Sequence, residues 1–421
     1  MIIMALNCGS SSVKYQLYDW EKKEVVAKGG VERVGLDNAF IVHEVPEKDS
    51  LKIMHDCPSH QAAIGLIIST ITSPEHGVLK DVKEISAIGH RVVHAGEKFT
   101  CSVKITDEVI QALKDVQHLA PLHNPANIEG IEAATAVLPS VPQVGVFDTA
   151  FHQTMPECAY MYPLPYEWYE KHQVRRYGFH GTSHLYVSKR AAVLLGKKPA
   201  NCNLITLHIG NGVSHTAIKN GVCIDTSMGL TPLEGAVMGT RSGDIDPAIP
   251  TFMMRTLNVD SKEMDSILNK KSGILGITGR FSDRRDVSEN AAKGDKLCKL
   301  ALDIETYRIK KYIGAYLAAV GKLDAIVFTA GVGEMSVEIR ELVLKGMEHL
   351  GLIIDKERNK SARTKKRETL ITTDDSPIKA FVIPTDEELV MIEDVAAIFA
   401  GTYKDHMNFE YSFSKPDFVR K

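Results

Sequence analysis

One arrangement of strands and glycine turns occurs twice in this chain of 421 residues. Near the N-terminus, the apolar residues 2–6 are followed by Asn7-Cys8-Gly9-Ser10 and by an alternating run over residues 12–18. The apolar residues 203–209 are followed in the same way by Gly210-Asn211-Gly212, a second alternating run and an Asn-Gly pair. Apolar runs predict buried strands, alternation predicts half-buried strands, and Asn-Gly predicts a hairpin. The repeat therefore predicts two related halves, and two copies are too few for a solenoid.

Strand-like and helix-like segments alternate along most of the chain, which is typical of an α/β protein. Apolar runs at residues 143–147 and 323–329 predict buried strands, and residues 182–196 predict a helix. Another helix is expected to start at Thr385, because Thr385 and Glu388 fit a capping box with Thr at the N-cap. The expected fold is α/β, with duplicated domains of mixed sheets flanked by helices.

Composition excludes several classes of protein. The chain has 50 Lys and Arg against 53 Asp and Glu, a net charge of −3. It therefore has no overall positive electrostatic potential that would attract nucleic acid. The chain has no apolar run near the ~18 residues that span a bilayer, and no basic region that begins a signal peptide. Its seven cysteines contain no C-x-x-C pair, so neither a disulfide framework nor a zinc ribbon is indicated. We therefore expect a cytoplasmic protein with no membrane or nucleic-acid partner.

Three glycine-containing turns follow apolar strands, at residues 7–12, 208–212 and 329–334. Glycine lets backbone N–H groups approach a phosphate closely, and the hydroxyls of Ser10 and Ser12 add donors. Neither a P-loop nor a complete dinucleotide fingerprint is present. The turns predict phosphate binding by a different fold.

Two other polar groups admit alternative interpretations. His180 and His184 have the spacing of a zinc pair, but the Glu of H-E-x-x-H is missing and Gly181 interrupts the helix, so zinc is disfavoured. A core or capping role is the simpler interpretation of His184. Glu387 has no role in the predicted capping box and is therefore available to bind Mg²⁺. The alternative is that Glu387 is an exposed carboxylate of the first helical turn, which the helix dipole favours.

A series of motifs, in order from residue 7 to residue 388, resembles the acetate kinase family of the sugar kinase, Hsc70 and actin superfamily. The motifs are Asn7-x-Gly9-Ser10-Ser11-Ser12-x-Lys14, residues 90–96, 121–125, 147–152, 176–184, Glu234-Gly235 with 238–244, and 383–385 with Glu387-Glu388. The resemblance implies two actin-like, ribonuclease H-like domains. The first covers residues 1–151 and is rejoined by the C-terminal helix at about 386–421. The second covers 152–385 and carries most of the nucleotide site.

The resemblance also implies an activity, reversible phosphoryl transfer from ATP to acetate that gives ADP and acetyl phosphate. Mg²⁺ is the implied cofactor, with Mn²⁺ as a substitute, and the implied assembly is a homodimer. A cleft that closes around the substrates would exclude water.

Roles follow residue by residue from the same resemblance. The catalytic positions are Asp148 as proton donor or acceptor, Arg91 as the substrate-binding arginine, and His180 and Arg241 as transition-state stabilisers. The pocket for the acetate methyl group comprises Val93, Leu122, Phe179 and Pro232. The Mg²⁺ residues are Asn7 and Glu387. The nucleotide-binding positions are Lys14, His208, Ile209, Gly210, Asn211, Gly212, Asp283, Arg284, Arg285, Gly331, Val332, Gly333, Glu334 and Met335.

Chemistry and two departures from the family pattern leave alternatives open. Acetate is already an anion at pH 7 and needs no general base, so Asp148 could instead orient Arg91 or a metal-bound water. Relatives usually have Asn at the position of Met335 and an apolar residue at that of Arg284, which keeps diphosphate as an alternative donor. A propionate or butyrate kinase with a wider pocket is a second alternative. An actin- or Hsc70-like ATP-driven binding protein is a remote one, because kinase motifs already fill the chain.

Overall fold

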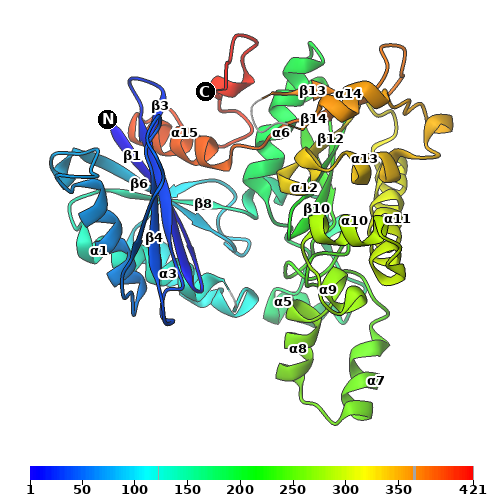
Figure 1. The fold of residues 1–421 in the computed structure, drawn as a ribbon, viewed down its shortest axis with the longest axis horizontal. Coiled ribbons are helices and arrows are strands. Elements are labelled where there is room, and N and C mark those ends of the chain that lie inside the picture. The colour runs from blue at the N-terminus through cyan, green and yellow to red at the C-terminus, as the bar shows by residue number, and fades with distance from the viewer. Residues whose placement is uncertain (122, 364–366, 421) are drawn as a thin grey trace. The chain divides into compact units, whose positions relative to one another are not determined.

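The computed structural model describes residues 1–121, 123–363 and 367–420. Within these limits the chain forms two compact units (Figure 1). The first unit contains residues 1–153 and 386–411, and the second contains residues 154–385 and 412–420.

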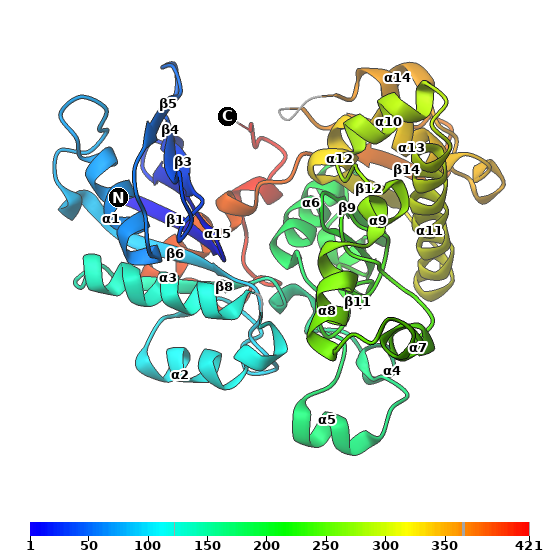
Figure 2. The same ribbon diagram turned by 60° about the horizontal axis from the view of Figure 1, so that its bottom comes forward.

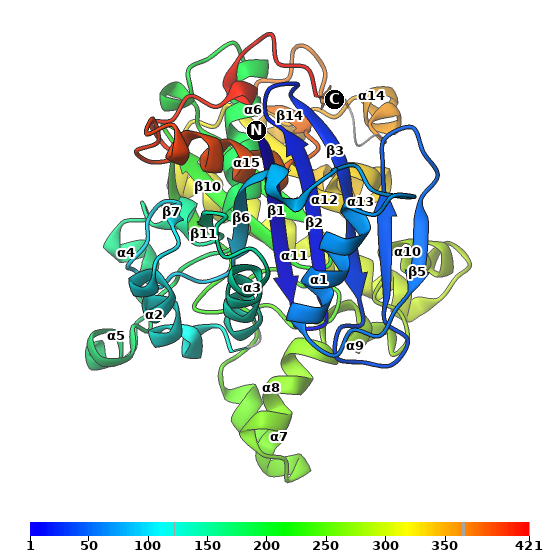
Figure 3. The ribbon, with the colours of Figure 1, turned by 90° about the vertical axis from the view of Figure 1, so that its left-hand side faces the viewer.

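The first unit is built on one mixed sheet of eight strands in the order β5-β4-β3-β2-β1-β6-β8-β7 (Figure 3). The strands are β1 (Ile2–Gly9), β2 (Ser12–Asp19), β3 (Glu24–Glu32), β4 (Phe40–Glu44), β5 (Leu51–Met54), β6 (Ile85–Val92), β7 (Val103–Lys104) and β8 (Gln143–Phe147). Strands β1 to β5 form an antiparallel meander. Strand β6 runs parallel to β1, and β8 runs parallel to β6. The carboxyl ends of β1, β6 and β8 therefore meet at one edge of the sheet.

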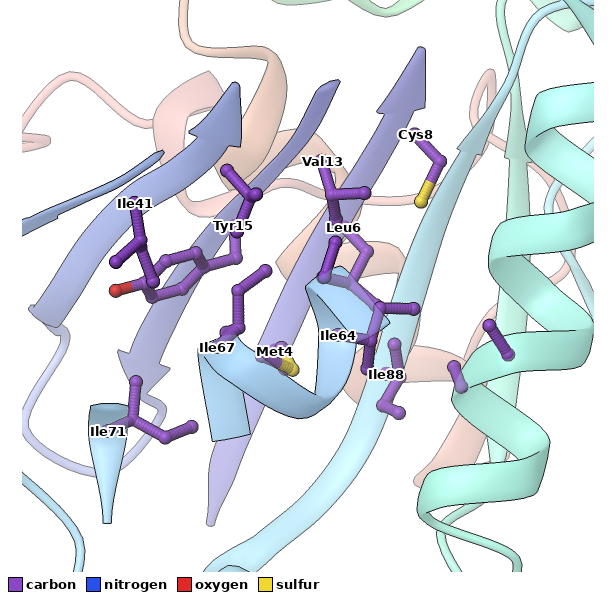
Figure 4. Close-up of a cluster of buried hydrophobic side chains, with 14 of the residues drawn as sticks. Met4, Leu6, Cys8, Val13, Tyr15, Ile41, Ile64, Ile67, Ile71 and Ile88 are labelled. Carbon is purple, nitrogen blue, oxygen red and sulfur yellow. The ribbon is translucent and has the colours of Figure 1, made fainter. Parts of the chain in front are cut away.

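Helices cover both faces of this sheet. Helices α1 (His60–Ile71) and α3 (Asn124–Val137) pack on one face, and α15 (Glu387–Phe399) packs against β1 and β6 on the other. Figure 4 shows the first interface, where Met4 and Leu6 of β1 meet Ile64 and Ile67 of α1. Each fully buried aliphatic side chain of this kind contributes about 1.5–3 kcal/mol to folding. Helix α2 (Asp107–Asp115) packs against α3.

The second unit repeats the central topology in a sheet of six strands, β11-β10-β9-β12-β14-β13. The strands are β9 (Leu204–Ile209), β10 (Val213–Lys219), β11 (Val222–Thr226), β12 (Ala325–Thr329), β13 (Thr369–Leu370) and β14 (Lys379–Val382). Strands β9, β10 and β11 form an antiparallel meander, β12 runs parallel to β9, and β14 runs parallel to β12. The predicted α/β fold and the duplicated meander are thereby confirmed.

Helix α6 (Gly181–Leu194) packs on β9 and β12, and α11 (Lys296–Val320) packs on β9 and β10 (Figure 2). The other helices of this unit are α4 (Glu157–Tyr160), α5 (Tyr166–His172), α7 (Ala248–Leu257), α8 (Ser261–Lys270), α9 (Gly273–Thr278), α10 (Arg284–Ala292), α12 (Ala330–Met335), α13 (Val337–Leu344) and α14 (Lys356–Ser361). None of the helices described is both long and apolar enough to cross a bilayer.

Two local predictions need correction. The N-cap of α15 is Asp386, whose carboxylate accepts a hydrogen bond from Leu389 N at 3.1 Å, and not Thr385. Glu388 is therefore one position too early for a capping box. The cause lies upstream, because Thr385 N donates to the Glu334 carboxylate at 3.1 Å and stays outside the helix. The third glycine segment is also no open turn, since it forms helix α12 directly after β12.

Candidate active site

The first unit places an arginine and a carboxylate at the edge where its parallel strands end. Arg91 lies near the end of β6, and Asp148 directly follows β8. Arg91 Nε donates to Asp148 Oδ1 at 2.9 Å, and its Nη2 donates to Oδ2 at 2.8 Å. The Asp148 side chain is only 3% exposed, whereas that of Arg91 is 21% exposed. A buried carboxylate thus fixes the guanidinium plane, while part of the guanidinium stays accessible to a ligand.

A cavity of about 350 Å³ opens beside this pair, lined among others by Asn7, Lys14 and Glu387. Glu387, the first residue of α15, lies 3.6 Å from Arg91 Nη2. The Asn7 carboxamide makes no hydrogen bond to any residue that the structure describes. Mg²⁺ favours oxygen ligands, and in nucleotide sites takes one or two protein ligands together with phosphates and water. Asn7 and Glu387 fit that requirement.

Two buried asparagines of α3 hold the strand ends in place. Asn127 accepts a hydrogen bond from Val93 N at 3.0 Å and donates to Cys8 O at 2.8 Å. Asn124 accepts from His94 N at 3.1 Å and donates to His94 O at 2.9 Å. Asn127 therefore ties β1 to the segment that follows β6. Sequence reasoning missed this role, although Asn124 lies within one of the family-like motifs.

The other predicted residues of the first unit lie next to the ends of strands, apart from Leu122. Ser10 lies exposed in the turn between β1 and β2, and Ser12 is the first residue of β2. Val93 is half-buried beyond the end of β6. Leu122, predicted for the acetate pocket, lies outside the described residues.

The second unit gathers imidazoles and a guanidinium at the end of β9. His180 precedes α6 in a left-handed backbone conformation with a φ of 58°, which is uncommon outside glycine and marks functional positions. Its ring stacks on His208 with centroids 4.0 Å apart. A Cβ added to Gly212 would lie 3.3 Å from Arg241 Nη2 and 3.4 Å from His180 Nε2. The Gly212 backbone therefore borders both groups.

Arg241 carries a charge that no described carboxylate balances. Its Nη1 donates to Pro232 O at 2.7 Å, and no ion pair involves it among the residues described. Burial lowers the pKa of this guanidinium. A half-buried cation without an anionic partner is costly, so the arrangement indicates a site for an anion.

The predicted acetate-pocket residues of this unit differ in exposure. Phe179 is 1% exposed, whereas Pro232 is half-buried. The side chain of Ile209, the last residue of β9, is 0% exposed, so only the Ile209 backbone is available to a nucleotide. Asn211 accepts a hydrogen bond from Gly239 N at 3.0 Å through its carbonyl, which joins two of the predicted segments.

The pair of arginines at the start of α10 divides into a buried and an exposed member. Arg284 is 5% exposed and donates to the fully buried Glu305 of α11, with Nη2 2.7 Å from Oε1. Arg285 is exposed and pairs with Asp283, the N-cap of α10, and this pairing lowers the Asp283 pKa to about 2. Arg284 thus stabilises the helix packing, and its charge is already balanced.

Helix α12 exposes only some of its predicted nucleotide positions. Gly331 and Met335 are exposed and Val332 is half-buried, whereas Gly333 and Glu334 are buried. Arg340 of α13 donates to the carbonyl oxygens of Gly333 and Glu334 at 2.8 and 3.0 Å, which fixes this short helix.

The structure therefore brings the predicted residues together in two groups, one in each unit. The first group is Asn7, Lys14, Arg91, Asp148 and Glu387, and the second is His180, His208, Asn211, Gly212 and Arg241. His184 is a fully buried core residue, as the simpler interpretation held. No group of three or more His, Cys, Asp or Glu suited to a metal occurs in the part of the chain described.

Comparison with known proteins gives one consistent result. Residues 2–393 match the model of the acetokinase family. The chain is 73% identical over 420 residues to the acetate kinase of Trichlorobacter lovleyi, with 100% of both chains covered. It is similar to the crystal structure of Porphyromonas gingivalis acetate kinase, with a TM-score of 0.90 and 47% identity over 94% of this chain and 99% of that chain. A propionate kinase from Francisella tularensis is similar with a TM-score of 0.87 and 42% identity, over 94% and 99% of the two chains.

Proposed function

The chain belongs to the acetokinase family, and we propose that it transfers the γ-phosphoryl group of ATP to acetate, reversibly, giving acetyl phosphate and ADP. The observation that carries this proposal is the Arg91 guanidinium, which the buried Asp148 holds in one plane and which stays 21% exposed beside Glu387. A guanidinium in a fixed plane is suited to a carboxylate, which it binds through two parallel hydrogen bonds.

Acetate acts as the nucleophile without losing a proton. One carboxylate oxygen forms the new P–O bond, the bond from the γ-phosphorus to the bridging oxygen breaks, and ADP leaves with the electron pair. Because no proton moves, we assign Asp148 the role of orienting Arg91. Asp148 holds both Nε and Nη2 of that guanidinium, which is the geometry that this role requires.

Asn7 and Glu387 would hold Mg²⁺, which when bound neutralises charge on the phosphates of ATP. Two observations support this assignment: the Asn7 carboxamide makes no described hydrogen bond, and Asn7 and Glu387 line the same cavity. Lys14 lines this cavity and adds a cation for the phosphates.

Arg241 would neutralise the charge that develops on the equatorial oxygens of the transferring phosphoryl group, and His180 would donate a hydrogen bond to them. Their proximity at Gly212 and the absence of a described carboxylate at Arg241 support this role. A carboxylate partner would already have used the charge that the transition state needs.

We favour ATP over diphosphate as the donor. A Cβ added to Gly331 would meet no atom within 4 Å, which leaves open space beside α12 for a nucleoside. Arg284, which raised the possibility of diphosphate, is paired with Glu305, so its charge is already balanced. We also expect a homodimer, as the family resemblance implies. Propionate remains the second candidate acceptor, because the chain is 42% identical to a propionate kinase.

The test is a hydroxylamine trap for acyl phosphate with Mg²⁺ and ATP, run in parallel with acetate, propionate and butyrate. We expect the largest kcat/KM with acetate and no product after EDTA treatment. A higher kcat/KM with propionate would reassign the acceptor, and product with diphosphate but not with ATP would reassign the donor. No product with any donor would refute the proposed function.

A further inference from the structure

A chain of buried hydrogen bonds begins at His180 and leads away from the ligand side of its ring. Ser214 Oγ lies 2.8 Å from His180 Nδ1 and 2.7 Å from His184 Nε2. His184 Nδ1 lies 2.7 Å from Thr206 Oγ1. Ser214, His184 and Thr206 are all 0% exposed. Four side chains are thus linked in a line with His180 at one end and a threonine hydroxyl at the other.

Helix and strands hold three members of this line, and the fourth, His180, is the N-cap of α6. Thr206 lies on β9, and Ser214 lies on the neighbouring antiparallel strand β10. His184 lies on the first turn of α6, four residues after His180. Because the sheet and the helix fix Thr206, Ser214 and His184, we expect the donor and acceptor order to change by moving hydrogens.

The order of the hydrogens follows from the terminal hydroxyl. In the described part of the chain, the Thr206 hydroxyl has His184 Nδ1 as its single partner. If Thr206 donates, then His184 Nε2 carries a hydrogen and donates to Ser214, and Ser214 donates to His180 Nδ1. Every buried hydrogen then has an acceptor, and the hydrogen of His180 is on Nε2.

The opposite order is less favourable. If His180 Nδ1 carried a hydrogen, it would donate to Ser214, Ser214 to His184 Nε2, and His184 Nδ1 to Thr206. The hydrogen of the buried Thr206 hydroxyl would then lack an acceptor among the described residues, and such a loss is unfavourable. A doubly protonated His180 would impose the same reversed order.

We propose that Thr206, His184 and Ser214 form a positioning relay that keeps the hydrogen of His180 on Nε2, beside Arg241 and Gly212. This inference rests on the proposed function, because it assigns His180 Nε2–H to the transferring phosphoryl group. The reversed tautomer would present a nitrogen lone pair to anionic oxygens, which is repulsive. His184 is therefore neither a metal ligand nor a residue of packing alone.

Four variants test the relay. Ser214→Ala cuts it at the atom that contacts His180, and Thr206→Val removes the terminal donor at nearly constant volume. Thr206→Ser keeps the terminal hydroxyl, so it should have most of the wild-type kcat that Thr206→Val loses. Thr216→Val is the matched control: Thr216 is a fully buried threonine on β10 whose hydroxyl pairs with that of Thr226, 3.0 Å away, and not with a histidine among the described residues.

We expect Ser214→Ala to lower kcat about 10- to 100-fold, a part of the effect of removing a whole transition-state donor. The KM values for acetate and ATP should change less than about twofold, because the relay acts on a contact made in the transition state. Thr206→Val should lower kcat by a smaller factor, and Thr216→Val should leave it unchanged. Unchanged kcat in both Ser214→Ala and Thr206→Val would refute the relay.

Ring-nitrogen NMR of the ¹⁵N-histidine enzyme gives a second readout, with the His180 signals assigned by comparison with His180→Asn. The wild type should show His180 as the Nε2–H tautomer, and Ser214→Ala should show a mixture. A His180 with its hydrogen on Nδ1 in the wild type would overturn the inference whatever the kinetics. A wild type that is inactive but has the Nε2–H tautomer would instead refute the proposed function alone.

Discussion

Replacing Asp148 with Asn separates an orienting role from a proton-transfer role. Asn keeps the shape and one acceptor, but its amide group would face a donor of Arg91. Two hydrogen bonds between charged groups, at 2.9 and 2.8 Å, are reduced to one hydrogen bond from the guanidinium to a neutral amide oxygen. With each such bond contributing about 1.5–3 kcal/mol, the expected loss is about 2–3 kcal/mol, or about 30- to 150-fold in kcat/KM for acetate.

A double-mutant cycle with Arg91→Ala tells the two roles apart. If Asp148 acts through Arg91, then Asp148→Asn should cause no further loss of kcat/KM in the Arg91→Ala background. If Asp148 transfers a proton, the two losses should multiply. Asp394→Asn is the matched control, because Asp394 is also a buried aspartate of the first unit and contacts Ser102 and Tyr411 instead of Arg91. Multiplicative losses, or a wild-type kcat/KM in Asp148→Asn, would refute the orienting role.

Three further outcomes are expected. Arg241→Gln should lower kcat about 100- to 1,000-fold. The midpoint of thermal unfolding should stay constant or rise, because the Arg241 guanidinium has no described carboxylate partner whose charge would be left buried. A lower midpoint would contradict this expectation. Arg284→Leu should lower the free energy of unfolding by about 3–5 kcal/mol, because the carboxylate of Glu305 stays buried, and adding Glu305→Leu should restore much of that loss in urea titrations. Burial raises the Asp394 pKa to about 7. Between about pH 4 and pH 7, the folded state therefore holds a proton on Asp394 that the unfolded state has already lost. The contribution of Asp394 to stability is therefore present below about pH 4 and lost as the pH rises towards 7, and the free energy of unfolding of Asp394→Asn relative to wild type should rise over that interval.

The sequence was informative where periodicity and turn chemistry act locally. The repeat of an apolar run, a glycine turn and an alternating run predicted both meanders, because period and turn type determine a hairpin without distant contacts. The start of α15 was wrong by one residue, because Thr385 is held by a hydrogen bond to Glu334, 51 residues earlier. No local pattern encodes that contact.

The relay at His180 was beyond sequence reasoning for the same physical reason. Alternation predicts that Ser214 and Thr206 point to a face of a strand, but it does not predict which side chain they meet. His184 was visible as a histidine four residues after His180, the spacing of a zinc pair, and the missing Glu and the presence of Gly181 favoured a core or capping residue instead. Its hydroxyl partners lie 22 and 30 residues away, so only the folded sheet shows the chain of hydrogen bonds.

The two arginines differ in how their charge is balanced. Arg91 has Asp148 and Glu387 beside it, so its orientation is fixed and its charge is partly balanced before a small monoanion binds. A fully unbalanced arginine there would hold acetate or acetyl phosphate tightly in the ground state, which does not raise kcat. Arg241 has no described carboxylate and is fixed by a neutral carbonyl, so its full charge is available when negative charge develops on the phosphoryl oxygens. Under the proposed function, the balanced Arg91 therefore orients the acceptor in the ground state, and the unbalanced Arg241 stabilises the transition state.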